Sequence, residues 1–170
     1  SDVPTTHANF EAIAKMRMMG IINGYEDSTF RPNNPIPRHH IAAMVGRSGI
    51  DLPVIRAAKS FADVPSTHSN YANIQKLYQA GILDGNGNKF NPNNNITHIQ
   101  LAKILTNIFG FEKADSKNYT FKDIKETHWG KSFAEIMVSN GIMPVSNNAF
   151  GADKPVSRAQ FAQYVNNSLA

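Results

Sequence analysis

One sequence unit occurs three times in this chain, and the repetition limits the folds that the chain can adopt. The copies occupy residues 20–45, 81–105 and 141–165, and each begins with a glycine. Gly20 and Gly81 are 61 positions apart, Gly81 and Gly141 are 60 apart, and a phenylalanine recurs every 60 residues at Phe30, Phe90 and Phe150. We therefore divide the chain into three repeats, residues 1–60, 61–120 and 121–170.

Each repeat is predicted to contain two short helices. The first carries apolar residues at intervals of three and four, as in Phe10, Ile13 and Met16. The glycine that follows is typical of a helix C-terminus, and the threonines ahead of the run are predicted N-caps; these threonines are Thr6, Thr67 and Thr127. A unit of about 60 residues with two such helices cannot bury its apolar surface alone. We therefore expect an all-α fold in which the three repeats share one core.

The second helix has the clearest pattern. Four apolar columns coincide in the three copies: Ile41, Ala42, Met44 and Val45; Leu101, Ala102, Ile104 and Leu105; Phe161, Ala162, Tyr164 and Val165. Thr97 with Gln100, and Ser157 with Gln160, have the form of capping boxes. Pro37 stands at this position in the first repeat, so its helix must be capped in another way.

Composition excludes several classes of protein. The net charge of +4 is spread evenly over the repeats, whereas nucleic-acid binders usually concentrate their basic residues on one strip. The absence of cysteine excludes disulfides and thiolate metal sites. No apolar run approaches the roughly 20 residues that a membrane helix needs. The chain starts at Ser1 without a signal segment, as a processed or trimmed fragment would.

A cation follows the cap of each second helix: Arg38, His98 or Arg158. A positive charge there opposes the helix dipole, so another function must justify it. An arginine beside free N–H groups at a helix start is well suited to bind a carboxylate or phosphate. The alternative is an arginine that lies over a neighbouring repeat and pairs with a local acid.

The combined motifs resemble the S-layer homology (SLH) domain in its usual triplet. They are F-x-D-V at residues 61–64, Thr-His in each repeat, G-I-[IL]-x-G after the first helix, T-F-x-P at residues 29–32, and a helix start similar to I-T-R-A-E. The resemblance implies an all-helical, pseudo-threefold assembly that anchors bacterial envelope proteins. It also implies an extracellular location at the cell wall or S-layer, fusion to a larger surface protein, and binding of pyruvylated secondary cell-wall polysaccharide in grooves between repeats. It implies no enzyme activity, cofactor, metal, nucleic acid or membrane span.

The family's ligand-binding positions can be transferred residue by residue. The anion-binding arginine corresponds to Arg38, His98 and Arg158, and the family's aromatic residue survives only as Trp129. The loop glycine corresponds to Gly24, which Tyr25 follows, and to Gly85; the third repeat has Val145 there. We expect three unequal grooves. The first would hold Gly24, Arg38 and residues 69–71 and bind the acidic sugar best; the second would hold Gly85, His98 and Trp129; the third would hold Arg158 with the start of the first repeat.

Several alternatives remain open at this stage. Trp129 could pack between repeats rather than hold a sugar. His7, His68 and His128 are aligned and could gather around a metal, or each could make a local hydrogen bond. A glycan hydrolase would need paired carboxylates, for which Asp2, Asp63 and Asp123 are the aligned candidates unless they shape turns. Finally, the chain could be an oligomerisation module whose glycan sites have degenerated.

Overall fold

The computed structural model describes residues 2–170, and this range is all-helical as predicted, without a β-sheet. Each repeat contributes an outer and an inner helix. The outer helices are α1 (Phe10–Met18), α3 (Tyr71–Gln79) and α5 (Lys131–Ser139), and the inner helices are α2 (Arg38–Arg47), α4 (His98–Phe109) and α6 (Arg158–Leu169).

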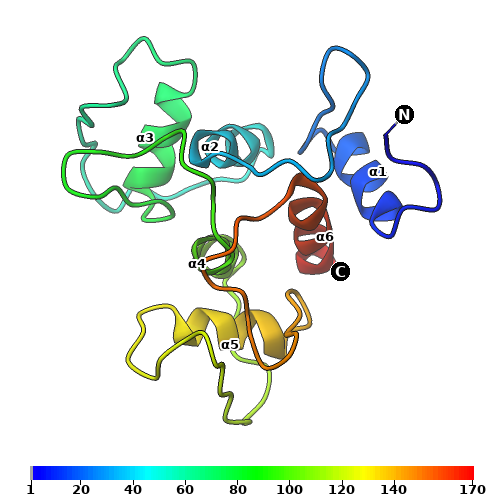
Figure 1. The fold of residues 1–170 in the computed structure, drawn as a ribbon. Helices are drawn as coiled ribbons and strands as arrows, with labels where there is room; N and C mark the ends of the chain where they lie inside the picture. Colours follow the sequence, from blue (N-terminus) through cyan, green and yellow to red (C-terminus); the bar gives the residue numbers. More distant parts are fainter. Residues whose placement is uncertain (1) are drawn as a thin grey trace.

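The repeats interlock through these helices. The inner helices lie in the middle of the molecule and the outer helices surround them (Figure 1). Each outer helix packs on the inner helix of another repeat: α3 on α2, α5 on α4, and α1 on α6. The first and last helices of the chain are therefore neighbours in space, and no repeat completes its helix packing alone.

One hydrophobic cluster joins all three repeats. The four apolar columns of the second helices are buried in every copy, as are Phe30, Phe90 and Phe150, so these predictions are confirmed. At the centre, the N–H of Ile96 donates to the carbonyl of Ile36 (2.8 Å) and the N–H of Val156 donates to that of Ile96 (3.0 Å). These backbone bonds bring the three inner-helix starts together.

The helix ends follow the sequence in part. Gly20, Gly81 and Gly141 end the outer helices with φ of 71°, 74° and 70°, a left-handed conformation that glycine adopts without steric cost. The predicted threonine caps are wrong, because the outer helices begin only at Phe10, Tyr71 and Lys131. The residues after each threonine form a separate turn, in which the histidine Nδ1 accepts the N–H two residues later, at 2.9–3.0 Å.

Candidate functional site

The inner-helix starts are where the repeats meet. The N–H groups of Arg38, His98 and Arg158 donate to loop carbonyls of another repeat, at 2.8–3.0 Å. The next N–H in each helix does the same, with Pro92, Ala152 and Pro32 as acceptors. The third N–H is bound by the side chain of the capping box in α4 and α6, and by the carbonyl of Pro37 in α2. The two predicted capping boxes are thus confirmed. The expectation of free amides that bind an anion is therefore wrong, because protein carbonyls already occupy them.

The two arginine side chains make the same contacts in their respective repeats. Arg38 donates from Nε to the carbonyl of Phe90 (3.2 Å) and from Nη2 to that of Asp84 (2.5 Å). Arg158 donates to the carbonyls of Phe30 (2.8 Å) and Asn23 (2.5 Å). Both side chains are buried, with residue exposures of 8% and 7%. Neither forms an ion pair with an acid within residues 2–170, so the predicted alternative of a local acidic partner is also wrong.

Each guanidinium also lies over the aromatic ring that anchors the loop. The centre of the Arg38 guanidinium is 4.7 Å from the centroid of Phe90, and that of Arg158 is 4.6 Å from Phe30. Burial lowers the pKa of both guanidiniums from its ordinary value. In both residues Nη1 has no hydrogen-bond partner in the part of the chain that the structure describes. One edge of each charged group therefore remains available to a ligand.

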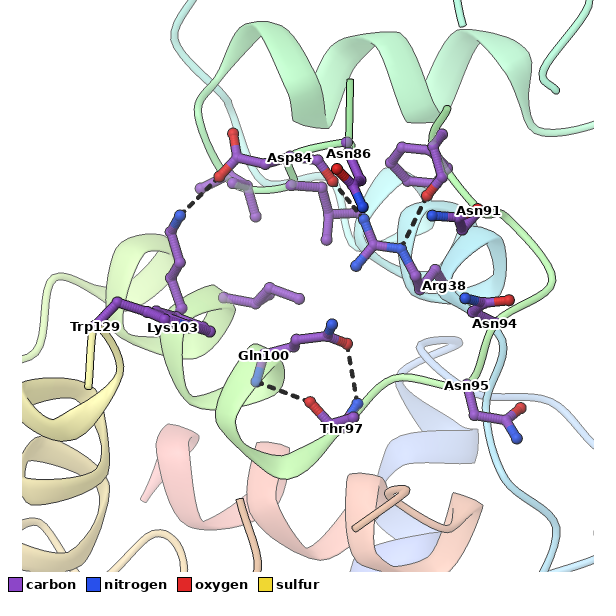
Figure 2. A pocket seen from close by; sticks show the side chains of 15 residues that line it. Arg38, Asp84, Asn86, Asn91, Asn94, Asn95, Thr97, Gln100, Lys103 and Trp129 are labelled. Carbon is purple, nitrogen blue, oxygen red and sulfur yellow. Dashed lines mark hydrogen bonds and ion pairs between the residues drawn. The ribbon is translucent and has the colours of Figure 1, made fainter. Parts of the chain in front are cut away.

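Arg38 lines a cleft of about 540 Å³ that we name the Trp129 cleft (Figure 2). Its walls come from all three repeats: Arg38 from the first, Gly85 from the second and Trp129 from the third. The other lining residues are Ile82, Leu83, Asp84, Asn86, Phe90, Asn91, Asn94, Asn95, Thr97, Gln100, Lys103 and Ile104. Trp129 is 56% exposed, so the alternative of core packing is wrong. Its ring stacks on His128, with centroids 5.4 Å apart, and thereby presents an apolar surface at the cleft.

The charges in the Trp129 cleft are partly neutralised. The carboxylate of Asp84 pairs with Arg56 and with Lys103, each at 2.7 Å. Burial alone would raise the pKa of Asp84, but the hydrogen bonds from Lys103 and Arg56 hold it below its ordinary value. Asp84 is therefore ionised and occupies Lys103, which leaves Arg38 as the cation without an acidic partner among the residues that line this cleft.

Gly85 has a packing reason to be glycine. A Cβ there would lie 2.4 Å from Cε1 of Phe61 and 2.7 Å from the carbonyl oxygen of Lys89. A side chain at Gly24 would similarly meet the carbonyl oxygen of Thr29 at 2.9 Å. Both glycines thus allow their loops to close tightly, and only their backbone is left to meet a ligand.

Arg158 lines a smaller cleft of about 190 Å³ that we name the Tyr25 cleft. It is lined by Ile22, Asn23, Gly24, Tyr25, His40, Ala43, Met44, Arg47 and Arg158. The ring of Tyr25 lies near two guanidiniums, with that of Arg31 at 3.8 Å and that of Arg158 at 4.8 Å from its centroid. The lining of this cleft contains two arginines, Arg47 and Arg158, and no acid.

His98 does not contribute a third cleft of this kind. Its ring nitrogens contact the carbonyl of Lys154 (2.9 Å) and the hydroxyl of Tyr164 (3.0 Å), and it lines neither named cleft. Burial lowers the pKa of His98, and burial raises the pKa of Tyr164 to about 12. The pair is neutral at pH 7, so this helix start lacks the charge that the arginines supply.

Gly85 and Trp129 share a cleft as predicted, but the predicted places of Arg38 and His98 in the grooves are wrong. Arg38 meets Gly85 and Trp129 rather than Gly24, and Arg158 meets Gly24 and Tyr25. The reason is that the loop of the second repeat packs on the start of α2, and the loop of the first repeat packs on the start of α6. Four charged or titratable residues that line the clefts were not predicted as site residues, namely Asp84, Lys103, His40 and Arg47. His40, Arg47 and Lys103 lie on the inner helices outside the aligned apolar columns, where their charge or titratable ring was the only signal, and Asp84 lies in the loop after α3.

The aligned aspartates have a structural function. Asp2 and Asp63 each accept two backbone N–H groups from the loop of their own repeat, and Asp123 accepts three, at 2.7–2.9 Å. This confirms that they shape turns and disfavours the paired-carboxylate alternative. The aligned histidines make local hydrogen bonds, which confirms that alternative too. Within residues 2–170 there is no cluster of three ligating side chains for a metal.

Comparison with known proteins yields a family and several relatives. The family model of the S-layer homology domain matches residues 1–39, 60–102 and 120–162. The chain is 32% identical over 171 residues to the S-layer protein sap of Bacillus anthracis, and 32% identical over 172 residues to an S-layer protein of Bacillus thuringiensis subsp. finitimus. Both matches cover 96% of this chain but 20% of the relative, so the chain spans about a fifth of the length of these relatives.

A more distant relative is an amylopullulanase of Thermoanaerobacterium thermosulfurigenes. It is 27% identical over 152 residues, which are 85% of this chain and 8% of the enzyme. The shared region thus occurs in S-layer proteins and, as a small part, in an enzyme. The matches point to a structural module of cell-surface proteins at the cell wall or S-layer, not to an enzyme. Within residues 2–170, no helix has the length and apolarity needed to cross a membrane.

Proposed function

Because the chain belongs to the S-layer homology family, we propose that it tethers a larger surface protein non-covalently to the cell wall. The ligand is an acidic, pyruvylated secondary cell-wall polysaccharide. The repeats at residues 1–60, 61–120 and 121–170 form one pseudo-threefold body, and the cyclic packing of α1 on α6, α3 on α2 and α5 on α4 supports this arrangement.

The convergence of Arg38, Gly85 and Trp129 in one cleft carries the proposal. A sugar ring lies on the exposed indole, since carbohydrate rings present apolar C–H faces and aromatic side chains offer matching surface. The pyruvyl carboxylate accepts hydrogen bonds from the free edge of the Arg38 guanidinium, which the loop carbonyls hold in place. The Asn86 and Asn91 side chains supply neutral donors and acceptors for sugar hydroxyls.

The expected affinity is moderate. A hydrogen bond between charged partners contributes about 1.5–3 kcal/mol, and sugar hydroxyl contacts that water partly mediates contribute less. The Tyr25 cleft, with Gly24, Tyr25 and Arg158, binds the same polymer at a second place. Two clefts on one chain of sugars increase the overall binding through effective concentration.

Glycan binding by a Trp129→Ala variant tests the proposal. The indole is mostly exposed, so its removal leaves the fold intact but should weaken binding to purified wall polysaccharide about tenfold or more. Val54→Ala is a matched control, because Val54 is 73% exposed and lines neither cleft. Removal of the pyruvyl groups from the glycan should weaken binding by the native chain to a similar extent. Unchanged affinity in the Trp129 variant, or binding that ignores the pyruvyl groups, contradicts the proposal.

A second candidate function is an oligomerisation module without glycan affinity. It is favoured by the observation that the side chains of Arg38, His98 and Arg158 all form hydrogen bonds with neighbouring repeats. The binding of the native chain to purified wall polysaccharide separates the two candidates. A native chain that self-associates in sedimentation but does not bind the polysaccharide identifies the second function.

A further inference from the structure

The Tyr25 cleft differs chemically from the Trp129 cleft. Its lining includes Arg158 and Arg47 and no carboxylate, whereas Asp84 in the Trp129 cleft neutralises Lys103. The nearby acid Asp27 pairs with Arg31 at 3.4 Å and does not line the cleft. The Tyr25 cleft therefore carries two uncompensated positive charges in its walls, and the Trp129 cleft carries one.

The additional charge comes from Arg47, which has no charged counterpart in the other two repeats. Arg47 corresponds to Asn107 and Asn167, 60 and 120 residues further along the chain. Its side chain is exposed and, within residues 2–170, makes a single long hydrogen bond, 3.4 Å to the carbonyl of Ile21. Arg47 can therefore turn to a ligand at little cost, while Arg158 is fixed by its bonds to Asn23 and Phe30.

His40 lines this cleft for a related reason. The equivalent residues, Gln100 and Gln160, are both engaged in capping boxes. In the first repeat Pro37 has no side-chain hydrogen-bonding group, so the residue at position 40 is released from capping. Its imidazole is half-buried, and its ring centroid lies 4.3 Å from that of His39. The loss of a helix cap thus places a titratable donor beside two arginines.

We propose that the Tyr25 cleft is a phosphate-binding site, with Arg158 and Arg47 as the charged ligands and His40 as an additional donor. A phosphate group has several oxygens and up to two negative charges, and can therefore satisfy two guanidiniums that approach from different helices. A single carboxylate fits the Trp129 cleft better, where one cation is available. The site stands on its own residues, and only the polymer that would carry the phosphate depends on the proposed function.

His40 provides a direct readout of occupancy. Burial lowers its pKa, and the charges of Arg158 and Arg47 lower it further. A phosphate bound between the two arginines would screen them and add a negative charge, so it should raise the pKa of His40. His39 faces His40 as well, and its own imidazole signals serve as an internal comparison.

The test is an NMR titration of the histidine rings in the intact 170-residue chain with inorganic phosphate at low ionic strength. The expected result is saturable binding that moves the His40 signals and raises its pKa, with weaker binding of acetate. Arg47→Gln should weaken phosphate binding about tenfold, whereas Arg17→Gln, which removes an exposed arginine outside this cleft, should not. The proposal would be overturned if phosphate causes no saturable shift of the His40 signals, or if Arg47→Gln and Arg17→Gln weaken phosphate binding equally. Either result would indicate general charge attraction.

A second ligand distinguishes the source of the phosphate. Mannose 6-phosphate that binds at least as tightly as inorganic phosphate supports a phosphoryl group carried on a glycan. Binding of inorganic phosphate with exclusion of the sugar phosphate supports a site for the free ion. Since Trp129→Ala leaves the Tyr25 cleft intact, its phosphate titration should match that of the native chain. Failure of phosphate binding and failure of glycan binding at Trp129 are therefore separate results.

Discussion

Replacement of Arg38 by methionine should destabilise the protein, apart from any effect on ligand binding. Methionine has a similar length but no donors, so the carbonyls of Asp84 and Phe90 lose their partners. Two hydrogen bonds from a charged donor correspond to about 3–6 kcal/mol in sum. Water can reach these carbonyls through the cleft, and the desolvation of a buried guanidinium, which lowers its pKa, disappears with the charge. The net loss should be about 2–3 kcal/mol.

This loss can be measured by unfolding in urea. The unfolding is monitored by circular dichroism and by the fluorescence of Trp129, the single tryptophan of the chain. For an m-value of about 2 kcal/mol/M, the midpoint should fall by about 1–1.5 M without a change in m. Arg17→Met is the matched control, because Arg17 is exposed and its side chain makes no hydrogen bond with residues 2–170. If Arg38→Met unfolds within 0.3 M of the native chain, the guanidinium does not hold the two repeats together, and our account of the inner-helix starts is wrong.

Three further predictions concern the fold. Ser157→Ala removes the capping box of α6 and should lower the unfolding free energy by about 1 kcal/mol, as measured in urea against Thr6→Ala, which caps no helix and should have no effect. Asp123→Asn weakens the acceptor of three backbone N–H groups and should cost about 1–2 kcal/mol at pH 7; because these bonds lower the pKa of Asp123 despite its partial burial, the difference should vanish as the pH falls below about 3.8. Burial, with the charges of His40 and His68, lowers the pKa of His39 to about 4 from 6.5. Its neutral form therefore stabilises the fold above pH 6.5, and thermal scans should show a loss of stability between pH 6.5 and 4 that is smaller in His39→Asn. An equal loss in the variant would exclude His39 as its source.

The parts of the fold that depend on local rules were predictable. Glycine at the helix ends, the capping boxes and the buried columns each follow from a few neighbouring residues, such as Ser157 with Gln160. The threonine caps failed because a competing turn, closed by the histidine Nδ1, lies between Thr6 and the helix. That turn also involves only local contacts, but a threonine ahead of an apolar run does not reveal whether such a turn comes between the threonine and the helix.

The composition of the clefts was not predictable from the repeats alone. Repetition identifies equivalent positions but does not say which copy of one position faces which copy of another. Arg38 could be paired with Gly24 or with Gly85 until the packing of each loop on the neighbouring inner helix was known. The departures from the repeat were the most informative residues in the end, since Pro37, His40 and Arg47 together distinguish the Tyr25 cleft.

The packing of α1 on α6 has a consequence for the order of events during synthesis. About 140 residues separate the end of α1 at Met18 from the start of α6 at Arg158. At roughly 5–20 residues per second, a ribosome needs about 7–28 s to complete that stretch. For this period the apolar side of α1 lacks its native helix partner, so the nascent chain must keep Ile13 and Met16 from premature association until α6 emerges.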